Sequence, residues 1–269
     1  MDTISVVIPA YNAAPYISET LQSIFAQSLP PVEIIVVDDC SKDNTHAVVA
    51  ALVQNHPYIK LIRAPRNFGG PAGPRNMGVK AAQGHLIAFC DADDIWHQDK
   101  LKLQMQAYLT SRPAIVGCAV KNFRQEDPHA LLNSSSVNCA HKPVSYWTML
   151  CKDVIAMSGV MCERSVLVST GFFDEAKEYV SVEDYQLWLR ILQNPALRAV
   201  KLNSILVAYR ILNTSLSSNR LKHMRKIRKV VFRQLISAHG WVLGLLLQPL
   251  VLIGYVYLAI YWRWLKKGL

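Results

Sequence analysis

Hydrophobic residues in the first 120 positions form short runs typical of strands, and these runs alternate with segments of helical periodicity. The strand-like runs are residues 4–9, 33–37, 60–62, 85–90 and 114–120, and the helical segments are residues 16–27, 45–54 and 100–109. This alternation predicts an α/β protein whose mostly parallel, Rossmann-like sheet is flanked by helices. Residues 121–145 are polar without periodicity, which indicates a variable surface segment, and helical and strand patterns resume over residues 146–194.

Polar residues follow three of these apolar runs, where the strands are expected to end. They are Pro9 and Tyr11, then Asp38 and Asp39, and finally Asp91, Asp93 and Asp94. In an open α/β sheet, ligands bind outside the carboxyl ends of the strands. We therefore expect these side chains to converge on one crevice.

Two acid pairs in this crevice are candidates for ligand chemistry. Asp91 and Asp93 form an Asp-x-Asp triplet that suits a hard divalent cation shared with diphosphate oxygens, although a solvated turn shows the same pattern. Asp38 and Asp39 suit hydrogen bonds to a base or a ribose, and a plain turn before the next helix is the alternative. The pattern predicts a nucleotide-binding crevice only if the pairs act together.

Two further segments add candidates. Arg75 lies in a loop rich in Gly and Pro, residues 63–84, which is expected to lead into a short helix and to face phosphate with its N–H groups. Glu183 and Asp184 precede an amphipathic segment, so they are expected at the start of a helix. A carboxylate there suits a general base, and ordinary helix-terminal charge is the alternative.

The net charge of +10 resides in the C-terminal part of the chain. Residues 220–269 hold ten of the 29 Lys and Arg and none of the 19 Asp and Glu, so residues 1–219 are balanced at 19 of each sign. A nucleic-acid binder would carry this charge on its folded domain, so an anionic membrane surface is the expected partner and nucleic acid is not. The six cysteines show no CxxC pair, which indicates neither a zinc knuckle nor a redox motif.

An apolar segment follows the basic one. Residues 241–262 contain no charge and would span roughly 33 Å as a helix, with basic residues at 220–240 before them and at 263–269 after them. Gln248 and Pro249 interrupt this segment, so a span, a re-entrant hairpin and an interfacial helix all remain open, beside a buried core helix. The N-terminus lacks the pattern of a signal peptide, and the charge bias favours a cytoplasmic catalytic domain.

Five segments in a fixed order together carry a family resemblance. They are VVIPAYN at 6–12, VVDDCS at 36–41, PRNMG at 74–78, FCDADD at 89–94 and EDYQLWLR at 183–190. Over about residues 3–212 the chain resembles family 2 glycosyltransferases of the bacterial surface-polysaccharide type. The resemblance implies a GT-A fold over residues 1–219, with a nucleotide-sugar-binding half at 1–120 and an acceptor-binding half at 121–219. It also implies Mn²⁺ or Mg²⁺ and inversion at the anomeric carbon.

The resemblance assigns roles position by position. Pro9, Tyr11 and Asp39 would line the base and ribose pocket with Asp38 beside them, and Arg75 would lie near the nucleotide. Asp93 would be the main metal ligand, helped by Asp91, and Asp184 would be the catalytic base. The acceptor-side candidates are Glu183, Trp188 and Arg210. The donor is then a nucleotide-diphosphate sugar, and Asp184 accepts the proton of the attacking hydroxyl.

Three departures refine these expectations. Cys40 stands where the family often has Gly, and Leu212 stands where many relatives place a His that helps to hold the metal or diphosphate. The Gln-x-x-Arg-Trp segment of processive synthases is missing, which favours transfer of a single sugar. We expect a lipid-linked oligosaccharide acceptor at the cytoplasmic face of the plasma membrane. A polyprenyl-phosphate acceptor and a noncatalytic nucleotide-sugar or anionic-lipid binding module are the alternatives.

Overall fold

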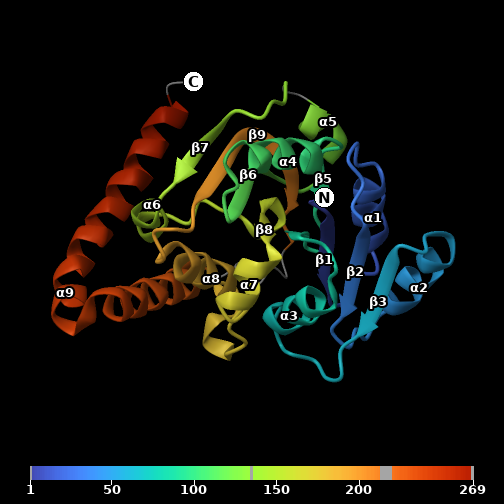
Figure 1. Cartoon of the computed structure of the whole chain (residues 1–269), viewed down its shortest axis with the longest axis horizontal. Helices are drawn as coiled ribbons and strands as arrows, with labels where there is room; N and C mark the ends of the chain where they lie inside the picture. Colours follow the sequence, from blue (N-terminus) through green and yellow to red (C-terminus); the bar gives the residue numbers. More distant parts are fainter. Residues whose placement is uncertain (1, 134–135, 213–219, 268–269) are drawn as a thin grey trace.

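A mixed sheet runs through the centre of the molecule, as the computed structural model in Figure 1 shows. The structure describes residues 2–133, 136–212 and 220–267. Within these residues the sheet has nine strands in the order β3-β2-β1-β4-β8-β6-β9-β5, with β7 beside β9. The strands are β1 (Ile4–Ala10), β2 (Glu33–Asp38), β3 (Ile59–Arg63), β4 (Leu86–Phe89), β5 (Ile95–Trp96), β6 (Ile115–Phe123), β7 (His141–Val144), β8 (Met161–Glu163) and β9 (Ala199–Arg210).

The four N-terminal strands in the order β3-β2-β1-β4 are all parallel, as the alternating pattern predicted. Their apolar residues point alternately to the two faces, so that Val7 and Phe89 join one core while Val6 and Ile8 join the other. A run of apolar residues without polar interruption is what a strand buried on both faces requires. This part of the sheet therefore follows directly from the sequence.

Helices cover both faces of the sheet (Figure 1). One face carries α1 (Ile17–Phe25), α2 (Thr45–Asn55) and α4 (Lys100–Ser111), and the other carries α3 (Ala72–Ala81), α6 (Tyr146–Cys151), α7 (Arg164–Ser169), α8 (Glu183–Leu192) and α9 (Arg220–Lys267). The short helix α5 (Pro128–Asn133) lies beside β9 and β5. The predicted helices at 16–27, 45–54 and 100–109 are confirmed.

The remainder of the sheet corrects the expectation of a mostly parallel arrangement. β8 runs antiparallel to β4 and to β6, β5 and β7 run antiparallel to β9, and only β6 and β9 pair in parallel. The 3-10 turn Met157–Gly159 precedes β8, and Val160 O accepts the N–H of Phe89 at the carboxyl end of β4. Because the chain enters β8 at the end of the sheet where β4 finishes, β8 runs back against β4.

The segment 121–145 is also more ordered than its polar sequence indicated. It contains the end of β6, the helix α5 and the strand β7, and residues 134–135 lie outside the described part. β6 crosses the predicted boundary at residue 120, and both predicted halves contribute strands to one sheet. The assignment of the halves to donor and acceptor stays a prediction.

Close packing between α3 and the sheet depends on one glycine. A Cβ on Gly78 would lie 2.4 Å from Cγ1 of Val7, so no larger residue fits without a shift of helix or strand. Gly78 thereby lets α3 lie directly on β1. The loop predicted at residues 63–84 thus holds a full helix that directs Arg75 toward the carboxyl edge of the sheet.

The C-terminal helix α9 consists of two arms that meet at Gly240 (Figure 1). Gly240 has φ 77° and ψ 170°, a backbone region that only glycine adopts readily. The first arm buries Val230 and Leu235 in the core, and the second arm folds back so that Gly244 lies against Ile236. The basic segment predicted at 220–240 is therefore a packed helix.

The apolar segment predicted at 241–262 forms most of the second arm. Across the described residues, no helix has both the length and the apolar character needed to cross a membrane. The predicted membrane-spanning segment is therefore not supported by the structure. Residues 268–269 of the predicted basic tail lie outside the described part.

Candidate active site

Parallel pairing brings the predicted site residues to one edge of the sheet. Ala10 pairs with Asp38, and Val7 pairs with Phe89, two residues before Asp91. Pro9 and Tyr11, Asp38 and Asp39, and Asp91 therefore follow three adjacent strands in space. Tyr11 is 47% exposed, so its ring is open to a ligand.

Asp38 and Asp39 are buried and build the turn after β2. Asp38 Oδ1 accepts the N–H of Ser41 at 3.0 Å, and Asp39 Oδ1 accepts the N–H of Phe68 at 2.9 Å. Burial, with a smaller effect of Asp38, raises the pKa of Asp39 although the Phe68 N–H lowers it. Both carboxylates thus fix the backbone of the crevice, and their predicted contacts with a base and ribose stay predictions.

Cys40 preserves the turn in which the family often has glycine. Its φ is 57°, in the left-handed region, and its Sγ donates to the carbonyl oxygen of Ala64 at 3.3 Å. The backbone conformation that glycine would adopt freely is therefore kept by a residue with a side-chain bond. A cysteine in place of glycine therefore adds backbone strain to the turn and keeps its conformation.

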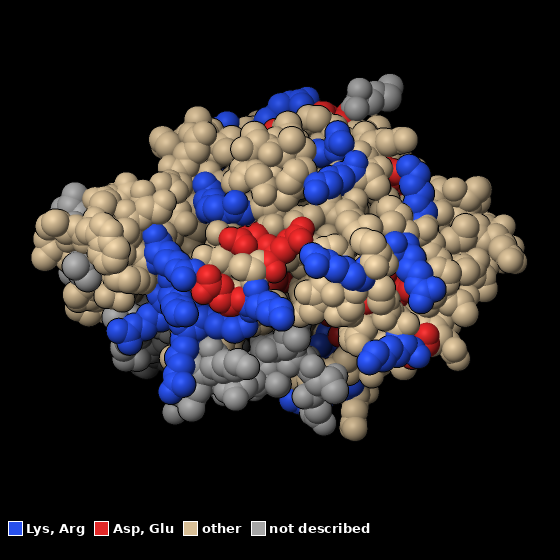
Figure 2. Space-filling model, turned by 90° about the horizontal axis from the view of Figure 1, so that it is seen from below, with Lys and Arg blue, Asp and Glu red and all other residues tan. Residues whose placement is uncertain are grey.

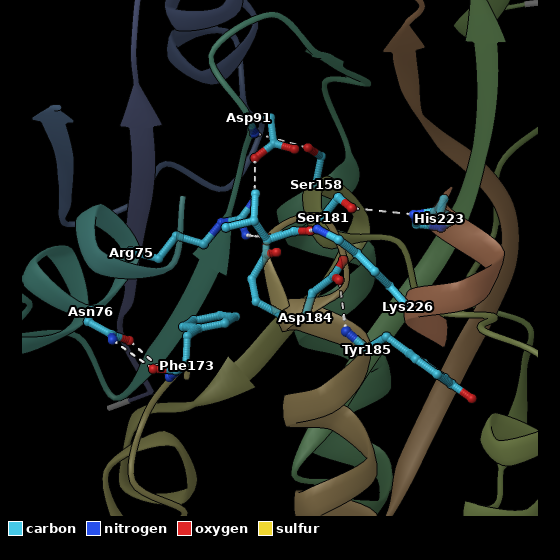
Figure 3. Close-up of polar contacts among 12 residues, drawn as sticks. Arg75, Asn76, Asp91, Ser158, Phe173, Ser181, Asp184, Tyr185, His223 and Lys226 are labelled. Carbon is cyan, nitrogen blue, oxygen red and sulfur yellow. Dashed lines mark hydrogen bonds and ion pairs between the residues drawn. The ribbon is translucent and has the colours of Figure 1, made fainter. Parts of the chain in front are cut away.

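Arg75 lies between the two groups of acids (Figure 3). Its Nη2 donates to Asp91 Oδ1 and its Nη1 donates to Glu183 Oε1, each at 2.7 Å, and the side chain is only 3% exposed. Burial alone would lower the pKa of Arg75, but Asp91 and Glu183 outweigh it and raise the pKa. One guanidinium therefore fixes the acid after β4 relative to the acid pair that starts α8.

The Asp91–Asp94 loop is held from two sides. Ser158 Oγ accepts the N–H of Asp91 at 2.9 Å. On the other side, Arg210 donates its backbone N–H to Asp94 Oδ1 and its Nε to the carbonyl oxygen of Asp93. Asp94 is fully buried, and burial together with the charges of Asp93 and Asp91 raises its pKa well above the ordinary value. The loop is therefore ordered by the protein itself.

Asp91 and Asp93 suit a divalent cation as part of a shared coordination sphere. Asp93 has a pKa raised to about 6, first by burial and then by the charge of Asp91, which shows that the two acids repel one another. The described residues include no group of three or more His, Cys, Asp or Glu side chains placed to hold a metal. Two carboxylates are nevertheless enough for Mg²⁺ or Mn²⁺ when phosphate and water oxygens complete the sphere.

Asp184 lies in the first turn of α8, facing the crevice (Figure 3). Burial, then the charges of Glu183 and Asp153, raise its pKa well above the ordinary value although Arg75 opposes them. A carboxylate with a raised pKa is a stronger base, so this environment suits proton abstraction. Its Oδ1 accepts the N–H of Tyr185 at 2.8 Å, which orients the group.

The three acceptor-side candidates take structural positions. Trp188 is fully buried and packs edge-on against Phe173, so it belongs to the core and cannot contact an acceptor there. Glu183 is 3% exposed and pairs with Arg75, and Arg210 pairs with Glu19 at 2.5 Å beside the Asp91–Asp94 loop. The sequence indicated polar chemistry near all three but not the partners that engage them.

Some residues of the site were missed because they lie far along the chain from the motifs. Ser158 and Glu19 belong to segments with no distinctive pattern. Tyr209 lies close enough to Asp91, Asp93, Asp94 and Asp184 that their charges, after burial, raise its pKa. The Tyr209-Arg210 pair at the end of a long strand was the one available signal.

One face of the molecule has a divided charge distribution. Figure 2 shows acidic side chains gathered near the centre of this face, with Lys and Arg side chains around them. The largest basic group lies on the side from which α9 extends in Figure 1. Negative charge at the centre suits a cation, and the basic surroundings suit phosphate groups.

Solved structures with the same architecture identify the fold. The chain resembles the Staphylococcus aureus TarS fragment 1–349 in complex with UDP-GlcNAc, with a TM-score of 0.71, 20% identity, and coverage of 94% of this chain and 71% of that one. It also resembles the mannosyltransferase PcManGT of Pyrobaculum calidifontis in complex with GDP-Man and Mn²⁺, with a TM-score of 0.65, 20% identity, and coverage of 94% and 73%. The fold is the GT-A fold, a mixed sheet between helices.

Sequence comparisons place the chain within this class. The description "Glycosyl transferase family 2" matches residues 5–158, and the chain belongs to that family of glycosyltransferases. It is 32% identical to the UDP-Glc:alpha-D-GlcNAc-diphosphoundecaprenol beta-1,3-glucosyltransferase WfgD of Escherichia coli, over 83% of each chain. It is 30% identical to the putative teichuronic acid biosynthesis glycosyltransferase TuaG of Bacillus subtilis, over 88% of this chain and 89% of that one.

Proposed function

We propose that this glycosyltransferase moves one sugar from a nucleotide-diphosphate donor to an acceptor hydroxyl, with inversion and with Mn²⁺ or Mg²⁺. The observation that carries the proposal is the Arg75 bridge, in which one buried guanidinium holds the metal-type acid Asp91 beside Glu183, the residue before Asp184. A donor diphosphate at Asp91 and Asp93 would place its anomeric carbon between the two groups of acids. That is the arrangement that a direct displacement needs.

The residues of the chain divide the chemistry between them. Asp184 takes the proton of the acceptor hydroxyl while that oxygen bonds to the anomeric carbon and the bond to the diphosphate breaks. A bound divalent cation offsets the negative charge on the departing nucleoside diphosphate. Arg75 keeps the two groups of acids in register, and no covalent intermediate with the enzyme is needed.

The relatives support a choice of substrates. WfgD is named for transfer from UDP-Glc to a GlcNAc-diphosphoundecaprenol, and a TarS fragment was solved with UDP-GlcNAc. We therefore propose a UDP-sugar donor and a lipid-linked diphosphate acceptor in the synthesis of a bacterial cell-surface polysaccharide. A polyprenyl monophosphate is the second acceptor class to test, because the catalytic arrangement would serve either one.

A lipid-linked acceptor requires the enzyme to work at a membrane. We place it at the cytoplasmic face of the plasma membrane, where the basic α9 would meet anionic lipid. The second arm of α9 exposes Trp241, Val242 and Leu246, each more than 60% accessible. Exposed apolar side chains of this kind suit insertion into the interface, which supports attachment through α9.

The decisive experiment separates donor binding from turnover. Binding and hydrolysis of a panel of nucleotide sugars with Mn²⁺ or Mg²⁺ would be measured for the wild type, Asp93→Ala and Asp184→Asn. Asp93→Ala should lose metal-dependent binding, whereas Asp184→Asn should bind normally and lose at least about 10³-fold in turnover. Asp127→Asn is the matched control, because Asp127 is an exposed acid to which no role in the site is assigned. Failure of the wild type to bind any donor would favour a noncatalytic lipid-binding module.

A further inference from the structure

The first arm of α9 contacts the segment that leads into the catalytic helix (Figure 3). Lys226 Nζ donates to the carbonyl oxygen of Val180, and His223 Nδ1 lies 3.5 Å from Ser181 Oγ. Ser181 has φ 76°, unusual for a residue with a side chain, and such strain persists where the surroundings hold it in place. α9 therefore places the ammonium group of Lys226 and the imidazole of His223 against the segment before Asp184.

Three cationic residues and His223 share this face of α9; burial, and then the charge of Lys226, lower the pKa of His223, and the three cations are not equally balanced. His223, Lys226, Lys229 and Arg233 are spaced to lie along one side of a helix. Arg233 pairs with Glu178 at 2.5 Å, and Lys229 lies 3.8 Å from the same residue. In the described part of the chain, Lys226 has no carboxylate within ion-pair distance and meets only a neutral carbonyl. Lys226 thus carries positive charge that an anion would balance.

Lys226 contacts the chain four residues before Asp184. Val180, which Lys226 contacts, is four residues before Asp184, a separation of at most about 14 Å along the chain. When the attacking hydroxyl of the acceptor sugar lies at Asp184, the anomeric carbon of that acceptor sugar lies across the sugar ring. The substituent on this carbon is therefore about one ring width farther from Asp184. A diphosphate at that carbon would come within reach of a flexible lysine side chain at the edge of the crevice.

We propose that Lys226, assisted by His223, binds the diphosphate of the acceptor and so selects acceptors whose sugar carries one. This inference rests on the proposed glycosyl transfer and adds the site that distinguishes diphosphate-linked acceptors from neutral ones. Lys226 is half-buried, which strengthens its attraction to phosphate relative to a fully solvated lysine. The anion is the acceptor's own diphosphate, in a position separate from the donor diphosphate at Asp91 and Asp93.

The test compares two soluble acceptors that differ only in charge. One is GlcNAc α-linked to a diphosphate with a short alkyl chain, and the other is the neutral alkyl glycoside of the same sugar. Lys226→Gln keeps a donor for Val180 and should raise KM for the diphosphate acceptor about tenfold or more, with little change for the neutral one. Lys226→Arg should restore the lower KM for the diphosphate acceptor.

Lys229→Gln is the matched control, because it removes the same charge one turn along α9 where Glu178 already balances it. Equal increases in KM for both acceptors in Lys226→Gln would mean that Lys226 only positions the loop before Asp184, and would overturn the proposal. A different contrary result would be that phosphatidylglycerol vesicles compete with the diphosphate acceptor in the wild type and not in Lys226→Gln. That result would assign the site to lipid headgroups and would also overturn the proposal. Loss of donor binding in the wild type would instead refute the proposed function itself.

Discussion

At the scale of single residues, the chemistry of the site depends on which acids are neutralised and which are not. Arg75 engages Asp91 and Glu183, whereas Asp93 and Asp184 keep carboxylates without a cationic side-chain partner within ion-pair distance among the described residues. The residues left without such a partner are the main expected metal ligand, Asp93, and the expected proton acceptor, Asp184. The fixed acids hold the backbone, and the unpaired ones have the raised pKa values that a reactive group requires.

The sequence indicated these residues but not their connections. Motif spacing was enough to nominate Asp91, Asp93 and Asp184, because each follows an apolar strand or starts an amphipathic helix. The spacing could not reveal that Arg75 joins Asp91 to Glu183, the residue before Asp184, since the contact between Arg75 and Glu183 bridges 108 positions. It also could not show that Trp188 faces inward, because an amphipathic helix with a wide apolar side offers several equivalent orientations.

Glu33, remote from the catalytic acids, provides a test of charge and stability. Burial would raise its pKa, but hydrogen bonds from Lys60, Ser5 and Gln83 outweigh it and lower the pKa. A lowered pKa means that ionised Glu33 stabilises the fold above its unfolded pKa of about 4.5, and that this contribution is lost as the pH falls.

Glu33→Gln should therefore reduce the free energy of unfolding by about 2 kcal/mol at pH 7. The difference from the wild type should narrow below about pH 4.5 in urea titrations followed by circular dichroism. Asp127→Asn, at an exposed loop position where the amide oxygen can still accept the N–H of His129, should leave stability nearly unchanged at both pH values. A difference for Glu33→Gln that stays constant with pH would contradict the role of the charge.

At the scale of elements, two glycines decide where helices lie. Gly78 allows α3 to approach β1, and Gly240 turns α9 back on itself. Only the first effect involves packing, because a Cβ on Gly240 would meet no atom within 4 Å. Gly240 is required purely for its backbone conformation.

Gly240→Ala should consequently destabilise the bend and nothing else. The expected loss is about 1–3 kcal/mol, the usual cost of holding a side-chain residue in this backbone region. Limited proteolysis should show faster cleavage near the junction of the two arms, and thermal unfolding should shift to lower temperature. Ser237→Ala, on the exposed side of the first arm, is the control. Unchanged proteolysis in Gly240→Ala would mean that the bend is not fixed by this residue.

At the scale of the whole molecule, the parallel half was predictable and the mixed half was not. The strands from Ile4 to Phe89 are apolar runs separated by recognisable helices, so periodicity fixes their type and order. β8 has three residues and β5 has two, too few for any periodic signal. β9 was missed as a strand because Asn203 and Ser204 interrupt its apolar pattern.

The exposed apolar side of α9 gives a prediction for the intact protein. Val242, Leu246 and Ile253 are spaced by four and seven residues, which places them along one side of the second arm. The wild type should sediment with vesicles containing phosphatidylglycerol, less strongly at high salt.

Val242→Ser with Leu246→Ser should weaken vesicle binding about tenfold or more, because two apolar side chains no longer enter the interface. Val168→Ser, an equally polar change at an exposed position of α7, should not weaken it. Equal sedimentation of all variants would remove α9 as the attachment surface.

The pairing of β9 with three earlier strands has a consequence for folding during translation. β9 pairs with β5, β6 and β7, so three earlier segments of the chain wait for residues 199–210 before their hydrogen bonds are complete. At ordinary rates of translation, the interval between the end of β6 and the end of β9 is on the order of ten seconds. During that interval the nascent chain exposes an unpaired strand edge, which is when it should depend most on chaperones.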